Sequence, residues 1–189
     1  GHWWFEGVDW LKLVLRGLAA RPSVEMSTAS GVIEHHPPRE VLSLPESSWG
    51  AGGGHFTWLN DDTEWMWPLI HAAERRMEDL VARYPDATGD LRSVLNQAAR
   101  ELLLLQSSDW PFLVTTGQAK EYATERFQEH LARYDQLCAI AERGTPTSED
   151  MVFTAALRER DNPFPAVNYA EWAPRQGFAG SAREAVAAE

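Results

Sequence analysis

The chain has 189 residues, of which 44% are hydrophobic and 24% are charged, so one packed domain with extensions is expected and disorder is not. The net charge of −11 would repel nucleic acids and anionic membranes, so neither is an expected partner. The single cysteine, Cys138, excludes an internal disulfide and fits a cytoplasmic location. No apolar run approaches the roughly 20 residues of a membrane helix, and no signal peptide is recognised.

The first third of the chain alternates between helical and irregular patterns. Residues 6–18 are predicted to form a helix because apolar residues recur at steps of three and four. Residues 21–46 are interrupted by prolines, with a short helix at 29–35 and a short extended piece at 41–44. Residues 47–62 combine four glycines with several aromatic residues, and this composition favours a binding loop over a polar linker.

The rest of the chain carries longer helical stripes. Helices are predicted over 64–84, 90–106, 118–143 and 147–160. The last of these begins with Thr147 and Asp150, a spacing typical of a capping box. No alternation is long enough to predict a sheet, so the predicted fold class is all-α, a helical bundle with an irregular Trp- and Gly-rich loop.

Tryptophan is the unusual component of the composition. The chain contains nine: Trp3, Trp4, Trp10, Trp49, Trp58, Trp65, Trp67, Trp110 and Trp172. Trp49 and Trp58 flank the glycine-rich loop, with His55 and Asn60 between or beside them. Large rigid indoles suit the apolar face of a sugar ring, and neighbouring polar groups suit its hydroxyls. The alternative is a tryptophan-rich surface that packs against another domain.

Other candidate sites are weaker. The glycines of the loop lack the Lys-Ser/Thr ending of a phosphate loop. The adjacent histidines His35 and His36 do not share a helical face, so no metal site is predicted. His130 lies on an apolar stripe and is expected to be a hydrogen-bonded core residue. Asp109, beside Trp110, is either a turn or cap residue or a ligand-binding carboxylate.

Several separated strings resemble one known family. They are GHWWFEG (1–7), LPESSWGAGGGHFTWLN (44–60), LLLLQSSDWPFLVTTGQAKEYA (102–123) and ERDNPFPAVNY (159–169). Together they resemble the C-terminal part of glycoside hydrolase family 57 branching enzymes, from Gly1 to about Trp172. In that family two tryptophans nine positions apart line the glucan groove. Trp49 and Trp58 have the same spacing.

The resemblance implies a particular division of the chain. Residues 1–20 would be the end of a catalytic (β/α)7 barrel that is otherwise missing, and residues 21–63 a connection that carries the glucan-binding loop. Residues 64–176 would be the C-terminal helical domain and residues 177–189 a tail. The family uses a glutamate nucleophile and an aspartate acid/base in a retaining reaction. Neither matches a position here, so no catalytic residue is assigned and the chain alone is predicted to be inactive.

The family further implies the partners of the chain. These would be α-1,4-glucan and the upstream barrel that carries both catalytic carboxylates, with no cofactor. Trp49 and Trp58 would stack on glucose rings, with His55 nearby. His2 and Trp3 would lie beside the catalytic aspartate, Asp109 would bond sugar hydroxyls, and Trp110 would pack behind it. An α-amylase or 4-α-glucanotransferase of the same family, or a non-catalytic helical binding module, remain alternatives.

Overall fold

The computed structural model of the chain describes residues 6–173 and divides into two compact units, one ending at Pro45 and one beginning at Glu46. Within the described range every regular element is a helix and no strand is present, which confirms the all-α fold class. None of the described helices is both long enough and apolar enough to cross a membrane. Three expectations fall outside the described residues, those for His2, Trp3 and 177–189.

The first unit contains two helices, α1 (Gly7–Ala19) and α2 (Ala29–His35). Each agrees with its predicted range to within one residue. The Thr28 hydroxyl caps α2 by accepting a hydrogen bond from the Gly31 N–H at 3.1 Å. The apolar side chains of α1 are exposed: Val8, Trp10, Leu11, Leu13, Leu15 and Leu18. Within the first unit, no described residue therefore buries the apolar face that gives this helix its periodicity.

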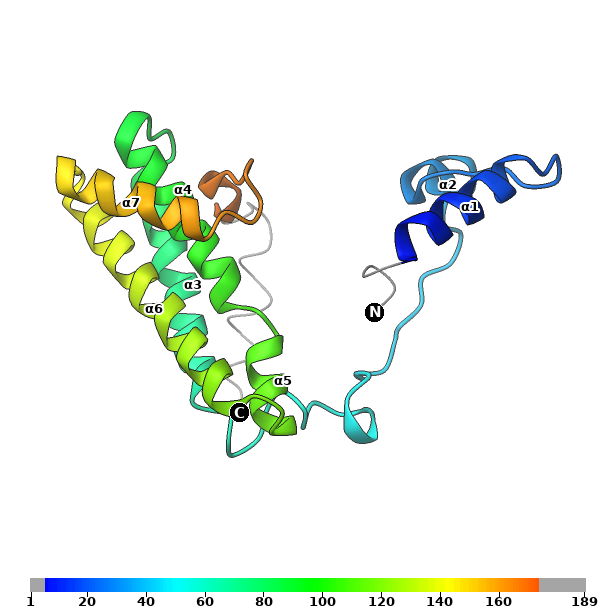
Figure 1. The fold of residues 1–189 in the computed structure, drawn as a ribbon, viewed down its shortest axis with the longest axis horizontal. Helices are drawn as coiled ribbons and strands as arrows, with labels where there is room; N and C mark the ends of the chain where they lie inside the picture. The colour runs from blue at the N-terminus through cyan, green and yellow to red at the C-terminus, as the bar shows by residue number, and fades with distance from the viewer. Residues whose placement is uncertain (1–5, 174–189) are drawn as a thin grey trace. The chain divides into compact units, whose positions relative to one another are not determined.

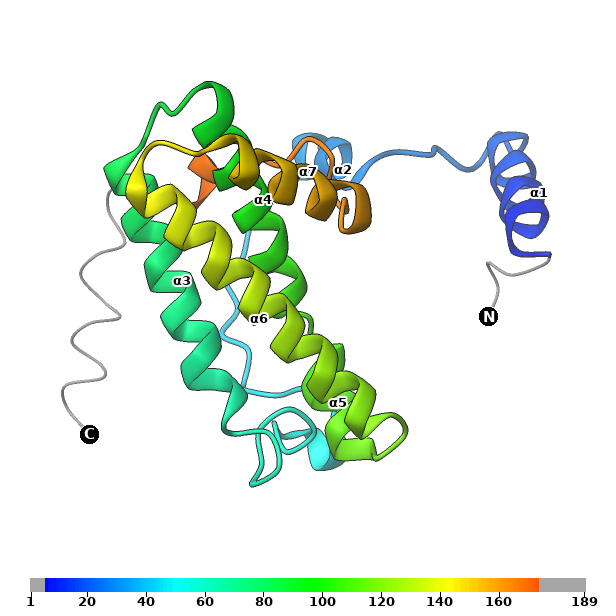
Figure 2. The ribbon, with the colours of Figure 1, turned by 60° about the vertical axis from the view of Figure 1, so that its left-hand side comes forward.

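The second unit is a helical bundle (Figure 1). Its elements in chain order are the 3-10 turn η1 (Ala51–Gly53), α3 (Met66–Arg83), α4 (Gly89–Leu105), α5 (Asp109–Thr116), α6 (Lys120–Arg143), α7 (Ser148–Arg160) and the 3-10 turn η2 (Tyr169–Trp172). The long helices α3, α4 and α6 lie side by side in both views (Figures 1 and 2). Helix α6 packs against α3, α4 and α5, and α7 packs against α4.

Local sequence explains where these helices begin and end. The predicted capping box is confirmed, because the Thr147 hydroxyl accepts from the Asp150 N–H and the Asp150 carboxylate accepts from the Thr147 N–H. Helix α6 ends at Gly144, whose φ of 77° is the left-handed conformation that glycine adopts without strain. Sequence periodicity did not predict α5, which accommodates Pro111 because a first-turn N–H has no partner within the helix.

The core of the bundle lies between α3, α4 and α6. Helix α4 supplies six fully buried apolar side chains to it: Val94, Leu95, Ala98, Ala99, Leu102 and Leu105. The buried Tyr134 hydroxyl of α6 donates a hydrogen bond to the Ala73 carbonyl of α3 at 2.7 Å. Burial raises the pKa of this phenol above its ordinary value, so it remains a hydrogen-bond donor at all physiological pH values.

The same core protects the single cysteine. Cys138 is fully buried, and burial raises the pKa of its thiol to about 12. Because the thiolate is the reactive form, we expect an aromatic disulfide reagent at about pH 8 to leave Cys138 unmodified in native buffer. In denaturant the same reagent should titrate one thiol per chain. Free glutathione serves as the reagent control, and fast native modification would mean that the α6 core opens readily.

Candidate functional site

Two indole rings meet in the irregular segment that precedes α3. The rings of Trp49 and Trp58 contact each other edge to face, with centroids 4.9 Å apart and planes at 83°. The ring of Trp49 also lies 5.8 Å from that of Phe112 in α5. Trp49 is 78% exposed and Trp58 is half-buried. The two tryptophans singled out from the sequence are therefore neighbours, and neither is sealed inside the bundle.

Hydrogen bonds to the bundle hold this segment in place. The Trp58 carbonyl accepts two, from the Trp67 indole N–H and from the Thr63 hydroxyl, each at 3.0 Å. Thr63 is fully buried, so its hydroxyl is shielded from competing water. The Asn60 side-chain amide donates to the Thr115 hydroxyl of α5 at 2.8 Å. These hydrogen bonds thus fix a largely irregular segment to the start of α3 and to the end of α5.

Gly50 is required by a close approach within the segment. A Cβ atom at this position would lie 2.8 Å from Cζ3 of Trp58 and 2.8 Å from the Thr57 hydroxyl. The same hydroxyl accepts a hydrogen bond from the Ala51 N–H at 3.2 Å. The backbone at Gly50 therefore packs directly on the Trp58 ring, which fixes the position of that indole.

The two indoles border a pocket of about 590 Å³, a volume within the range of small-molecule sites. Its lining residues are Trp49, His55, Trp58, Leu59, Trp67, His71 and Ser108. Three of them are tryptophans, and the two imidazoles and a serine hydroxyl add polar groups. Apolar walls with a few hydrogen-bonding groups are the combination that a sugar ring requires.

Among the other predicted site residues, His55 belongs to this pocket. Its Nε2 lies 2.7 Å from a carboxylate oxygen of Glu46, which orients the ring. Asp109 is exposed in the first turn of α5 and does not line the pocket, although its neighbour Ser108 does. The carboxylate at this position is therefore adjacent to the pocket and not part of its wall.

Trp110 lies in a different environment. Its indole N–H donates to the Leu104 carbonyl at 2.8 Å, and its ring stacks on His130 with centroids 6.1 Å apart at 27°. The half-buried ring thus joins the end of α4 to α6. This placement separates Trp110 from the pocket that Trp49 and Trp58 border.

Four lining residues were not proposed from the sequence: Leu59, Trp67, His71 and Ser108. Trp67 and His71 are four positions apart in α3, so they project from the same face of the helix, and their rings lie 6.1 Å apart. That spacing was a usable signal. Leu59 and Ser108 carry no such pattern and enter only through the tertiary fold.

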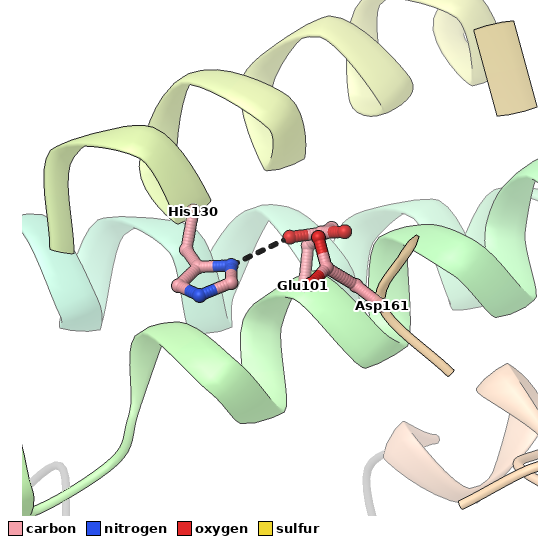
Figure 3. Close-up of side chains that lie close together, drawn as sticks. All are labelled: Glu101, His130 and Asp161. Atoms are coloured by element: carbon pink, nitrogen blue, oxygen red, sulfur yellow. Dashed lines mark hydrogen bonds and ion pairs between the residues drawn. The ribbon is translucent and has the colours of Figure 1, made fainter. Parts of the chain in front are cut away.

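A second group of ionisable side chains, two carboxylates and one imidazole, is buried deeper in the bundle. Glu101 of α4, His130 of α6 and Asp161 after α7 place their ligand-type atoms within 4.8 Å of one another (Figure 3). The His130 Nδ1 lies 2.8 Å from a Glu101 carboxylate oxygen, and both side chains are fully buried. His130 is thus the hydrogen-bonded core histidine that its position in the apolar stripe predicted.

The surroundings of this cluster favour a structural network over a cation site. Arg126 donates to Nε2 of His130 at 3.2 Å, so Nδ1 carries the proton and donates it to Glu101. Arg133 forms an ion pair with Asp161 at 3.0 Å. A cation would have to displace both a proton and a guanidinium, and the two arginines would repel it.

Comparison with known proteins gives a consistent assignment. The family model described as "1,4-alpha-glucan branching enzyme, C-terminal" matches residues 69–172. The chain is 46% identical to a 1,4-alpha-glucan branching enzyme of Thermococcus kodakarensis over 166 residues, which is 87% of this chain and 24% of that protein. It is 36% identical to a probable branching enzyme of Mycobacterium tuberculosis over 69% of this chain and 26% of that protein.

Solved structures agree. A family 57 branching enzyme from Thermococcus kodakaraensis, crystallised with glucose, aligns with a TM-score of 0.69 and 43% identity over 93% of this chain and 32% of that chain. The Pyrococcus horikoshii branching enzyme aligns with a TM-score of 0.69 and 42% identity over 93% of this chain and 34% of that chain. The α-amylase AmyC of Thermotoga maritima aligns with a TM-score of 0.60 and 34% identity over 93% of this chain and 32% of that chain. The chain spans about a quarter of the length of its curated relatives.

We expect Gly50→Ala to displace the Trp58 indole, because the new Cβ would overlap that ring. Overpacking of this kind costs about 1–3 kcal/mol, so part of the cost should appear in the free energy of unfolding. The edge-to-face indole pair should give a coupled circular dichroism signal that weakens in the variant. Gly54→Ala is the matched control, since its Cβ would meet no atom within 4 Å. Identical spectra for the two variants would contradict the packing described.

Proposed function

Since the chain belongs to the family of 1,4-alpha-glucan branching enzyme C-terminal domains, we propose that it is the substrate-side part of an enzyme that makes α-1,6 branches in α-1,4-glucan. The observation that carries this proposal is the pair of perpendicular indoles, Trp49 and Trp58, on the border of a pocket of about 590 Å³. The whole enzyme would transfer a glucan segment by a retaining reaction, with this chain binding the glucan.

The geometry of the pair supports binding of more than one sugar unit. Two planes at 83° cannot both lie flat on a single pyranose ring. Each indole would instead stack on a different glucose residue. The exposed face of Trp49 is available for this contact, while Trp67 and Leu59 extend the apolar wall. His55 and His71 would hydrogen-bond the hydroxyl rim of the bound sugar.

Catalysis would come from elsewhere in the longer protein. We assign no catalytic carboxylate to this chain, so the chain alone should neither cleave nor transfer glucan. Its contribution would be to hold a sugar acceptor where water is scarce. An apolar wall favours the incoming sugar hydroxyl over water at the glycosyl-enzyme stage, which separates transfer from hydrolysis.

The exposed face of α1 supports the proposed domain division. Its apolar residues, including Trp10 at 60% exposed, are not covered by the other described residues of the first unit. A helix with such a face is stable when another element buries it. We propose that α1 is the last helix of the catalytic barrel, that residues 21–63 connect it to the bundle, and that the bundle forms the C-terminal domain to about residue 176.

We also propose a cytoplasmic location for the enzyme. It is supported by the cysteine content, a single residue that is buried and forms no disulfide.

Hydrolysis of α-glucan is the second candidate activity. The solved α-amylase of Thermotoga maritima shares this helical fold over most of the chain. The fold by itself therefore does not separate branching from hydrolysis, and the products must.

We expect full-length enzyme incubated with amylose to form α-1,6 linkages without a matching rise in reducing ends. Proton NMR measures the new linkages, and digestion with a debranching enzyme should release short linear chains. Reducing ends that accumulate without branches would replace the branching proposal with hydrolysis. The isolated 189-residue chain is the negative control and should produce neither.

We expect Trp58→Ala and Trp49→Ala in the full-length enzyme to lower kcat/KM for glucan transfer. Loss of one stacking contact costs about 1–3 kcal/mol, taking base stacking as the guide, which corresponds to roughly 5- to 150-fold. The change should appear without global unfolding, as measured by circular dichroism melting.

Phe56→Ala is the matched control for these two variants. Phe56 is an exposed aromatic of the same segment that does not line the pocket. Its removal should leave kcat/KM within about twofold of the parent. Equal losses in all three variants would point to damage of the segment, and unchanged kinetics in Trp58→Ala would remove that residue from the site.

A further inference from the structure

A smaller pocket of about 200 Å³ lies between α4 and α7, where it shares no lining residue with the tryptophan pocket. Its lining residues are Ser93, Asn96, Arg100, Met151, Thr154, Ala155, Arg158 and Pro165. They include two arginines and no carboxylate. Pockets with two like charges and no counter-charge in their walls are unusual, because each charge destabilises the other.

Arg100 is the deeper of the two and is only 3% exposed. One terminal nitrogen donates to the Gln97 side-chain oxygen at 3.0 Å, and the other donates to the Pro165 carbonyl at 3.1 Å. Both acceptors are neutral. The Nε–H of Arg100 is buried and has no hydrogen-bond partner among the described residues. The Arg100 guanidinium therefore has one N–H group without an acceptor and no anion beside it. A buried cation normally has an anionic partner, because that partner offsets the free-energy cost of removing the charge from water.

Arg158 faces the same pocket from α7 and is exposed. Among residues 6–173 its guanidinium has no carboxylate partner within ion-pair distance. The pKa of Arg100 is lowered from its ordinary value by burial first and by the charge of Arg158 second. The two guanidinium groups thus place two positive charges at the pocket in a chain whose net charge is −11.

The remaining polar groups provide one further donor. The Ser93 and Thr154 hydroxyls donate to carbonyls of their own helices, those of Gly89 and Asp150. The Asn96 side-chain oxygen accepts from the Tyr169 N–H at 3.0 Å, and among residues 6–173 no acceptor lies within hydrogen-bond distance of the Asn96 amide N–H groups. The pocket therefore offers donors from Arg100, Arg158 and Asn96, and it calls for an acceptor-rich ligand.

We propose that this pocket binds a phosphate-type oxyanion, either free inorganic phosphate or the phosphoryl group of a phosphorylated sugar. A phosphoryl group carries a charge of about −1.5 to −2 at pH 7, which suits a site with two guanidinium groups. Its oxygens can accept from both arginines and from Asn96 at the same time. Binding also supplies the counter-charge that Arg100 otherwise lacks. This site is independent of the proposed glucan pocket.

The test uses the full-length protein that carries this chain, titrated calorimetrically with inorganic phosphate and, separately, with glucose 6-phosphate at constant ionic strength. We expect saturable binding and a rise in Tm, because a ligand that binds only the folded state stabilises it. Binding of both ligands would identify the phosphoryl group as the recognised unit. Binding of glucose 6-phosphate alone would assign the site to a phosphorylated sugar, and binding of phosphate alone to the free ion.

Arg158→Gln is the test variant, since Arg158 is exposed and its replacement should not disturb the fold. We expect it to weaken binding at least about tenfold, as loss of a charge-assisted hydrogen bond does. Arg75→Gln is the matched control, because Arg75 is an exposed arginine of α3 outside the pocket. Equal effects of the two variants, or no saturable binding of either ligand by the parent protein, would overturn the proposal.

Discussion

The hydrogen bond from the Trp67 indole to the Trp58 carbonyl joins the irregular segment to the helical bundle. Without it, and without the buried Thr63 hydroxyl on the same carbonyl, residues 47–62 would be a glycine-rich loop with many accessible conformations. The bond fixes the backbone at Trp58, and the Gly50 backbone then fixes its ring. The orientation of the candidate site is therefore set by the first turns of α3.

The bundle that supports this segment is held by burial and by one polar network. Helix α4 supplies an apolar face to α6, and the Glu101–His130 pair lies within the same interface. Removing Glu101 would leave the buried Nδ1–H of His130 without its acceptor, and removing His130 would leave a buried carboxylate oxygen of Glu101 without that donor. Either loss costs more than the intact pair contributes. The network thus favours one register of α4 against α6. That register in turn places Trp110, which stacks on His130.

Much of the bundle could be predicted from the sequence because its helices are amphipathic and carry strong local signals. The capping box at Thr147 is a four-residue pattern, and the stripe of α6 repeats over many turns. Helix α5 was missed because it is short and contains Pro111. Periodicity cannot detect a helix of two turns whose boundaries are set by tertiary contacts.

The candidate site was only partly predictable for a related reason. Composition and spacing pointed to Trp49, Trp58 and His55, and the fold brings all three to one pocket. Asp109 and Trp110 follow each other in sequence, yet one is exposed beside the pocket and the other packs on His130. Leu59 and Ser108 join the wall only because the segment folds back on α5. The glucan-binding roles of Trp49, Trp58 and His55, like the domain limits, remain predictions.

For the glucan binding proposed above, the right angle between the two indoles has a consequence for the shape of the polymer. Flat aromatic platforms set side by side in one plane would match a straight, ribbon-like polysaccharide such as a β-1,4-linked chain. Platforms at 83° to each other match a chain that turns between successive units, as an α-1,4-linked helix does. Selection between the two linkage types would then reside in the angle between two side chains and would require no hydrogen bond to the linkage oxygen.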